Sequence, residues 1–387
     1  MKKNENHLTI QGIHYESGKP VRIEIRDGLI AGVTEISKAD GPDLFVAPGL
    51  IDNQINGYAG VDFSGDELLT KSIVNATRAI WRDGVTTFLP TILTNSHENL
   101  IKNFTILNNA IKTEVSLYES IPGFHLEGPY ISPVEGYRGC HPLKHIRKAS
   151  WKEFMMYQEA SGGRIIQVTL APEIEGALEF IRKCVENGII VAIGHTSASS
   201  DEIFRAVDSG ATISTHLGNG CANFIHRHNN PIWPQLANDM LTPTLIADGL
   251  HLNQEELNVF YKVKGSGNII LTSDMTYLGG MPPGRYSFLG SEVVLSEEGM
   301  LLNTELNCLA GASFPLKKGV ETVMNFTGCL LSDAVKMASE NASKIYGLND
   351  RGNLDPGNRA DIILFDLTRN KIRIERTFLK GKLVFQA

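Results

Sequence analysis

The sequence predicts an α/β protein: a (β/α)8 TIM-like barrel with a small β-sandwich domain formed by the N- and C-terminal segments. Three observations predict it, namely β-like sequence at both ends, eight strand-like segments between them, and helical sequence between those strands. A chain of 387 residues has room for one large and one small domain. We expect the small domain to comprise residues 1–47 and 352–387, and the barrel residues 48–351.

Both ends of the chain have the pattern of short strands. HLTIQGIHY and PVRIEIRDGLIAGVTEI near the start, and ADIILFDL and KGKLVFQA near the end, alternate apolar and polar residues with Gly, Asp or Pro at the breaks. Each end alone is too small to bury a core. One shared, discontinuous domain is therefore favoured over two independent β appendages.

Eight apolar segments in the middle of the chain predict the barrel strands. Helical patterns intervene, as in residues 67–84, 177–188 and 199–210. A doubly wound open sheet is the alternative, but no G-x-G-x-x-G follows the first strand. The Gly- and Pro-rich residues 277–313 predict an excursion over the barrel mouth. The eight segments contain, in order, GLIDNQIN, GVTTFLPTIL, IPGFHLEGPY, RIIQVTLAPE, GIIVAIGHT, ATISTHLGN, PTLIADGLH and NIILTSDM.

Composition excludes several classes of protein. A net charge of −7 argues against a nucleic-acid surface. The start MKKNENHLTI lacks the apolar region of a signal peptide, and no apolar run approaches the roughly 18 residues that span a bilayer. Five cysteines without a C-x-x-C pair indicate reduced thiols. We expect a cytoplasmic protein that binds neither nucleic acid nor membrane.

Chemistry-bearing side chains follow the predicted strands. His195 and His216 stand at equivalent strand ends within residues 189–220, and Glu127 ends an earlier strand. In a barrel, such ends gather the catalytic groups. One carboxylate and two imidazoles form a known ligand set for catalytic zinc, and a bound ion lowers the pKa of its water to about 7. Asp274, after the last strand, is a candidate proton carrier.

Other interpretations of these residues remain open. Glu127 could cap the turn before Gly128, and Asp274 could be an N-cap or Asx-turn residue. His125 faces the same side of its strand as Glu127 and is either a support for the site or a packed polar residue. Asp248 is equally ambiguous. No G-x-S-x-G pattern indicates a serine nucleophile.

An ordered set of motifs resembles the N-acetylglucosamine-6-phosphate deacetylase family of the amidohydrolase superfamily. The resemblance covers nearly the whole chain. It implies a metal-dependent hydrolase that removes acetate from an amino sugar phosphate, most simply N-acetylglucosamine 6-phosphate, and a homodimer. The motifs are APGLIDNQING, FHLEGPY, YRGCHP, VTLAPE, GHTSAS, THLGNG, ADGLHL, LTSDM, LAGAS and NASKIYGL…GNLDPGNRADIILFD.

The resemblance assigns roles to individual residues. It implies one divalent metal ion per subunit, zinc by its ligands, with iron, cobalt or manganese as alternatives. Arg227 would reach the phosphate bound to the neighbouring subunit. The implied metal ligands are Glu127, His195 and His216; the catalytic residues are Asp274 and His141, the latter polarising the acetyl carbonyl; the substrate-binding residues are Cys140, Asn219, Gly220, Arg227, His251, Leu309, Ala310 and Gly311.

The chain also departs from the family pattern. Gln54 and Asn56 replace the His-x-His that binds a second metal in many superfamily members, which favours a single ion. Cys221 and the His226–Arg227–His228 cluster are unusual, so the sugar and its phosphorylation stay open. The alternatives are a hydrolase of another amide (a different N-acetyl sugar, an N-acyl amino acid or a cyclic amide) and a metal-free scaffold.

Overall fold

Eight parallel strands form the predicted barrel sheet. The computed structural model describes residues 7–387. Its largest sheet has the order β14-β13-β12-β11-β10-β9-β8-β5, with each strand hydrogen-bonded to the next. The (β/α)8 prediction is confirmed. The strands are β5 (Leu50–Ile55), β8 (Val85–Leu93), β9 (Phe124–Glu127), β10 (Ile165–Leu170), β11 (Ile190–Ile193), β12 (Ile213–Ser214), β13 (Thr242–Leu245) and β14 (Ile270–Leu271).

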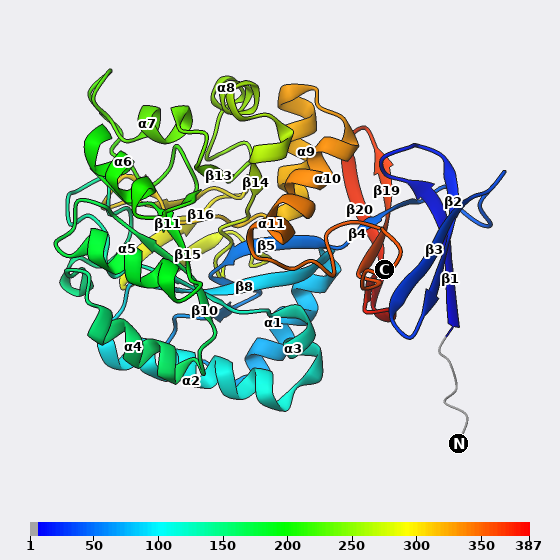
Figure 1. Ribbon diagram of the computed structural model, residues 1–387, viewed down its shortest axis with the longest axis horizontal. Helices are drawn as coiled ribbons and strands as arrows, with labels where there is room; N and C mark the ends of the chain where they lie inside the picture. Colours follow the sequence, from blue (N-terminus) through cyan, green and yellow to red (C-terminus); the bar gives the residue numbers. More distant parts are fainter. Residues whose placement is uncertain (1–6) are drawn as a thin grey trace.

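Helices surround this sheet, as Figure 1 shows. Their apolar faces pack on the outside of the strands, in one extended core. The predicted helix at 199–210 is α6, and its capping box joins Ser199 to Glu202. The helices are α1 (Thr70–Arg82), α2 (His97–Thr113), α3 (Val115–Ser120), α4 (Trp151–Ala160), α5 (Ala177–Glu186), α6 (Ser200–Asp208), α7 (Ile232–Ala237), α8 (Gln254–Lys264), α9 (Leu316–Thr327), α10 (Leu331–Met337) and α11 (Glu340–Ile345), with 3-10 turns at Leu143–His145 and Ser266–Asn268.

The barrel closes between its first and last strands through a buried carboxylate. Asp52 on β5 accepts hydrogen bonds from Thr272 Oγ1 and from the Ser273 amide, both at 3.1 Å. Further along, the Asn56 amide donates to the Met275 carbonyl at 2.8 Å. Asp52 is fully buried, and its Oδ2 has no partner among residues 7–387. The Asp52 side chain thus supplies hydrogen bonds between β5 and the residues after β14, where the two-residue strand β14 is too short to form a full backbone ladder.

The two chain ends form the predicted small β domain. Its seven strands make one continuous sheet of order β21-β20-β19-β4-β1-β2-β3, curved around a second apolar core (Figure 1). The central strand β4 runs parallel to β1 and antiparallel to β19. The strands are β1 (His7–His14), β2 (Pro20–Arg26), β3 (Leu29–Glu35), β4 (Phe45–Pro48), β19 (Ile362–Thr368), β20 (Lys371–Leu379) and β21 (Lys382–Gln386).

The excursion at 277–313 contains a four-stranded antiparallel sheet. Its apolar side chains pack on Leu93, at the C-terminal end of β8, and on Cys140. The sheet therefore forms one wall at the mouth of the barrel. Within residues 7–387, no helix has both the length and the apolarity to cross a bilayer. The strands are β15 (Gly284–Phe288), β16 (Ser291–Leu295), β17 (Leu301–Asn303) and β18 (Cys308–Leu309), and a separate hairpin pairs β6 (Gly57–Tyr58) with β7 (Val61–Asp62).

Asp52→Asn should stabilise the protein at neutral pH more than at acidic pH. Burial raises the pKa of Asp52 to about 6 from the ordinary 3.8. The folded state therefore holds this proton more tightly than the unfolded chain, and the stability it contributes is lost as the pH rises through 6. We expect the variant to gain up to about 3 kcal/mol over the parent between pH 4 and 8. Unfolding midpoints of both proteins across that range test this, and a constant difference would contradict it.

Candidate active site

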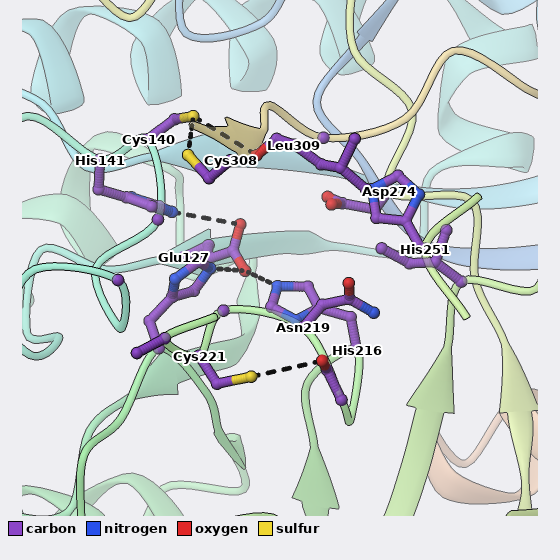
Figure 2. A pocket seen from close by; sticks show the side chains of 18 of the residues that line it. Glu127, Cys140, His141, His216, Asn219, Cys221, His251, Asp274, Cys308 and Leu309 are labelled. Carbon is purple, nitrogen blue, oxygen red and sulfur yellow. Dashed lines mark hydrogen bonds and ion pairs between the residues drawn. The ribbon is translucent and has the colours of Figure 1, made fainter. Parts of the chain in front are cut away.

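Four buried side chains converge at the C-terminal ends of barrel strands. Glu127 ends β9, while His195, His216 and Asp274 follow β11, β12 and β14 by two or three residues. All four line one pocket, and Figure 2 shows Glu127, His216 and Asp274 among its side chains. The carboxyl ends of parallel strands meet on one face of a barrel, which is why residues so distant in sequence become neighbours.

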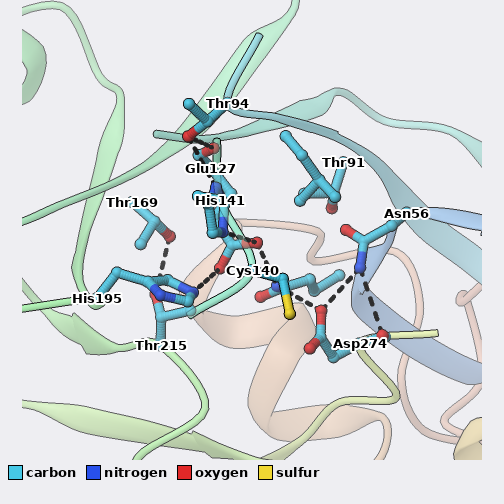
Figure 3. A network of polar contacts seen from close by, with 12 residues as sticks. Asn56, Thr91, Thr94, Glu127, Cys140, His141, Thr169, His195, Thr215 and Asp274 are labelled. Carbon is cyan, nitrogen blue, oxygen red and sulfur yellow. Dashed lines mark hydrogen bonds and ion pairs between the residues drawn. The ribbon is translucent and has the colours of Figure 1, made fainter. Parts of the chain in front are cut away.

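Glu127 stands at the centre of three imidazoles. Its Oε1 lies 3.1 Å from His216 Nε2 and 3.5 Å from His195 Nε2. Its Oε2 lies 4.0 Å from His141 Nε2. The predicted metal ligands are thus brought together, and His141 joins them: ligand atoms of Glu127, His141 and His195 all lie within 4.8 Å of one another. Figure 3 shows His141 and His195 beside the Glu127 carboxylate.

The orientations of the two strand-end imidazoles fit a metal ion. His195 Nδ1 lies 3.1 Å from the Tyr137 carbonyl oxygen, which can only accept, so Nδ1 carries a hydrogen. Loss of the other ring proton, which Nε2 shares with Glu127, would leave the Nε2 lone pair for a cation. His216 Nδ1 is buried without a partner among residues 7–387. The Nε2 atoms of His195 and His216 both lie near Glu127 Oε1, as ligands of one cation would.

Protons compete for this cluster. Burial raises the pKa of Glu127, but its hydrogen bonds with His195 and His216 outweigh burial and hold the pKa well below the ordinary value. Burial lowers the pKa of His216, but the bond to Glu127 offsets this and raises the pKa overall. Burial and the nearby His195 lower the pKa of His141 to about 3. A cation entering the cluster would displace the proton from His216.

Two amides of β5 hold the second carboxylate. Gln54 Nε2 donates to Glu127 Oε2 at 3.0 Å and to Asp274 Oδ1 at 2.7 Å. Asn56 Nδ2 donates to the same Asp274 oxygen at 2.8 Å (Figure 3). The carboxylate of Asp274 accepts from these two amides, and no backbone N–H among residues 7–387 donates to it, so it is neither an N-cap nor an Asx-turn residue. Gln54 presents hydrogens, rather than lone pairs, to both carboxylates.

The backbone at this face has unusual conformations. His195, His216 and Asp274 have φ values of 49°, 30° and 50°, in the left-handed region that non-glycine residues rarely adopt. Such backbone persists only where the surrounding contacts enforce it, and it clusters at functional sites. Gly220 has a φ of 60°, and a Cβ there would lie 3.0 Å from His195 Nδ1. Only glycine lets the chain pass so close to that imidazole.

The pocket has a volume of about 400 Å³, a size that suits a small organic molecule. Two of the residues predicted to bind the substrate do not line this pocket. Ala310 is buried behind the wall at 1% exposure, and Arg227 lies on the exposed loop 221–230 outside the pocket of its own chain. The pocket is lined by the other predicted residues, namely Cys140, His141, Asn219, Gly220, His251, Leu309 and Gly311.

Two lining residues offer polar atoms to a ligand. Asn219 Nδ2 is buried without a hydrogen-bond partner among residues 7–387. His251 Nδ1 lies 2.8 Å from Asp248 Oδ2, an acceptor. Nδ1 therefore carries a hydrogen, and Nε2 is the nitrogen left for a ligand. Asp248, ambiguous in the sequence, orients this imidazole.

One functional contact had no signal in the sequence. Thr94 Oγ1, just beyond β8, lies 2.7 Å from His141 Nδ1 and fixes that imidazole (Figure 3). A threonine after a β-rich apolar run is ordinary, so only the fold reveals its partner. His125 lies deeper in the barrel, where its Nε2 lies 2.7 Å from Thr169 Oγ1. It is a packed polar residue that does not contact Glu127.

Comparison with known proteins identifies relatives along most of the chain. The Amidohydrolase family matches residues 45–384. N-acetylglucosamine-6-phosphate deacetylase of Bacillus subtilis (strain 168) is 32% identical over 346 residues, which cover 89% of this chain and 85% of that protein. An N-acetylgalactosamine-6-phosphate deacetylase of Shewanella sp. (strain ANA-3) is 28% identical, covering 94% of this chain and 92% of that protein.

A solved structure supports the same relationship. A mutant of N-acetyl-D-glucosamine-6-phosphate deacetylase from Mycobacterium smegmatis, in complex with N-acetyl-D-glucosamine-6-phosphate, superposes with a TM-score of 0.88. It is 25% identical to this chain, and the match covers 98% of this chain and 99% of the other. The barrel and the terminal β domain are thus both shared.

Glu127→Ala should abolish metal binding. We expect the chelator-stripped parent to recover about one zinc ion per chain and to gain several degrees in its unfolding midpoint, because a ligand that binds only the folded state stabilises it. Elemental analysis and thermal unfolding measure both effects. Glu256→Gln removes a carboxylate that lines the same pocket outside the cluster, and it should bind zinc normally. Full zinc binding by Glu127→Ala would contradict the ligand assignment.

Proposed function

The chain belongs to the amidohydrolase family, among the N-acetylglucosamine-6-phosphate deacetylases, and we propose that it hydrolyses the acetamide of an N-acetylhexosamine 6-phosphate to the amino sugar phosphate and acetate. One observation supports this most strongly. A buried carboxylate with three imidazoles lies beside a second carboxylate, Asp274, and one amide bonds to both in a pocket of sugar size. A metal-free scaffold would have no reason to retain this arrangement.

A divalent ion fits the residues at the base of the pocket. Glu127, His195 and His216 would hold it, and zinc suits this set, with iron, cobalt or manganese as alternatives. When bound, the ion supplies an acidified water and polarises the acetyl carbonyl. One ion per subunit is proposed, since Gln54 and Asn56 direct amide hydrogens at Asp274 where a second cation would otherwise lie.

Asp274 is proposed to carry the proton. Its Oδ1 accepts from both amides, whereas no donor among residues 7–387 contacts Oδ2. Burial and the nearby Glu127 carboxylate raise the pKa of Asp274, which makes it a stronger base than a surface aspartate. Oδ2 would take a proton from the attacking water and deliver it to the amine nitrogen as the C–N bond breaks.

His141 is proposed to donate a hydrogen bond to the oxyanion that forms on the acetyl group. A neutral imidazole can do so through Nε2 only if Nδ1 accepts. The Thr94 hydroxyl, 2.7 Å from Nδ1, would set this tautomer by donating to Nδ1 in place of the Glu127 carbonyl oxygen, which is 3.4 Å away. Such a fixed donor typically contributes roughly 3 kcal/mol to transition-state stabilisation.

The phosphate would need a cation from another subunit. The lining of the pocket includes Asn219, Gly220, His251, Leu309 and Gly311 for the sugar, but no Lys or Arg among the described residues. Arg227 is exposed near Phe224, which is 96% exposed. An apolar and a cationic side chain on one projecting loop suit a homodimer in which Arg227 completes the partner's site.

The galactosamine epimer is a second candidate substrate. The Shewanella relative carries that specificity in its name and covers the chain as fully as the glucosamine enzymes do. The sugar phosphate itself fits a cytoplasmic enzyme, as do the five free cysteines.

Asp274→Asn should bind the metal and the substrate but turn over very slowly. Asparagine keeps the shape of the side chain but cannot accept the proton, so we expect kcat to fall roughly 10²–10⁴-fold. Acetate release and metal content measure the two properties. A near-normal rate would exclude the proposed proton carrier.

Arg227→Ala should remove the preference for phosphorylated sugars. We expect the parent to release acetate faster from N-acetylhexosamine 6-phosphates than from the free sugars or N-acyl amino acids. The variant should lose roughly tenfold or more in kcat/KM on the phosphates alone, because a charge-assisted hydrogen bond is removed. Asn229→Ala, a neutral change on the same exposed loop, is the control. Equal rates on free and phosphorylated sugars by the parent would contradict the substrate class.

A further inference from the structure

Two cysteine thiols meet at the mouth of the active-site pocket. Cys140 and Cys308 lie 168 residues apart in the sequence, yet their sulfur atoms are 3.3 Å apart. Both line the pocket, and Figure 2 shows them above the Glu127 carboxylate. Cys140 precedes His141, and Cys308 precedes Leu309 on β18. The pair therefore joins the loop that carries His141 to the excursion sheet.

We propose that Cys140 and Cys308 form a reversible disulfide in response to peroxide, and that this bond switches the enzyme off. The inhibition, but not the disulfide itself, rests on the proposed deacetylase function. All five cysteines are free, as a reducing compartment requires, so the bond would be a transient oxidised state.

The geometry needs only a small adjustment. A disulfide bond measures about 2.05 Å, so the two sulfurs must approach by roughly 1.3 Å. Cys308 lies on β18, a two-residue strand at the edge of its sheet that pairs only with β17. Cys140 lies in a loop without regular structure, directly after Gly139. Neither backbone is locked into a central ladder, so both can yield.

The two sulfurs differ in reactivity. The hydrogen bond from Cys140 lowers the pKa of Cys308, and Arg138 acts in the same direction, against the effect of burial. The same contact, together with burial, raises the pKa of Cys140. Both thiols are partly buried, so the lower pKa of Cys308 is what distinguishes it from Cys140. It is therefore the thiolate that a peroxide would meet first.

The chemistry balances with hydrogen peroxide as the oxidant. The Cys308 thiolate attacks one peroxide oxygen, the O–O bond breaks, and hydroxide leaves to give a sulfenic acid. The Cys140 sulfur then attacks the sulfenic sulfur, the S–O bond breaks, and water leaves with the thiol proton. In total, two thiols lose two electrons and two protons, and one peroxide becomes two waters.

Bond formation would disturb both sides of the pocket. His141 is tied to Thr94 at 2.7 Å, and Cys140 Sγ lies 3.5 Å from the Leu309 carbonyl oxygen. Drawing the sulfurs together moves the Leu309 wall against the His141 loop by about 1 Å, a misplacement that can cost on the order of 100-fold in rate. The oxidised enzyme should therefore turn over slowly.

Peptide mapping of the intact, metal-loaded enzyme after hydrogen peroxide treatment tests the proposal. We expect the oxidised sample to contain a peptide in which Cys140 is linked to Cys308. This linked peptide should disappear when the sample is reduced. Acetate release should fall at least tenfold and recover with a phosphine reductant without added metal. Cys308→Ser should keep the basal rate and resist peroxide, whereas Cys221→Ser, which removes a pocket thiol without a thiol partner, should remain sensitive.

Each result supports or overturns a distinct part of the proposal. Absence of the linked peptide overturns the disulfide, and a linked peptide with an unchanged rate overturns its inhibitory role. Equal peroxide sensitivity of Cys308→Ser and the parent assigns the loss to another group, and Cys308→Ala repeats this comparison if the serine variant folds poorly. An untreated parent without deacetylase activity would overturn the proposed function, while the peptide map would still decide the disulfide.

Discussion

The site depends on one interaction, the burial of the ionised Glu127 carboxylate among imidazoles. Only 2% of this residue is exposed, and an unpaired carboxylate in such a place would cost several kcal/mol. Its partners arrive on separate strands, His195 after β11, His216 after β12 and Gln54 from β5. The curved sheet is what brings these three side chains to the same carboxylate. The site therefore forms only in the folded barrel, and the buried carboxylate is tolerated there only because these partners surround it.

The convergence of the strand-end residues could be predicted from the sequence, because the C-terminal ends of parallel barrel strands all lie on one face. Glu127, His195 and His216 needed no further information. The residues that were missed depend on which way a side chain points across the closed barrel. Leu309 and Gly311 line the pocket, whereas Ala310, assigned to the substrate from the sequence, packs in the apolar cluster of the wall. Thr94 and Cys308 likewise acquire partners only through contacts between distant segments.

The amides at the end of β5 also set the character of the second carboxylate. A lysine or arginine bonded directly to Asp274 would lower its pKa and weaken it as a base. Gln54 and Asn56 instead offer neutral donors, which fix the position of the carboxylate without removing its affinity for a proton. The two amides thus fix the position of the Asp274 carboxylate, whereas burial and the nearby Glu127 make it more basic. The left-handed backbone at Asp274 completes the arrangement by turning the side chain toward the pocket.

The shared terminal sheet imposes an order on biosynthesis. Strand β4 lies between β1, which is synthesised before it, and β19, which is synthesised only after the whole barrel. At 5–20 residues per second, the apolar face around Val46 waits on the order of tens of seconds for the strands that cover it. By then the barrel strands have been synthesised, while the terminal sheet still lacks β19 to β21. Synthesis of β19 to β21, rather than barrel formation, is the event that completes this sheet.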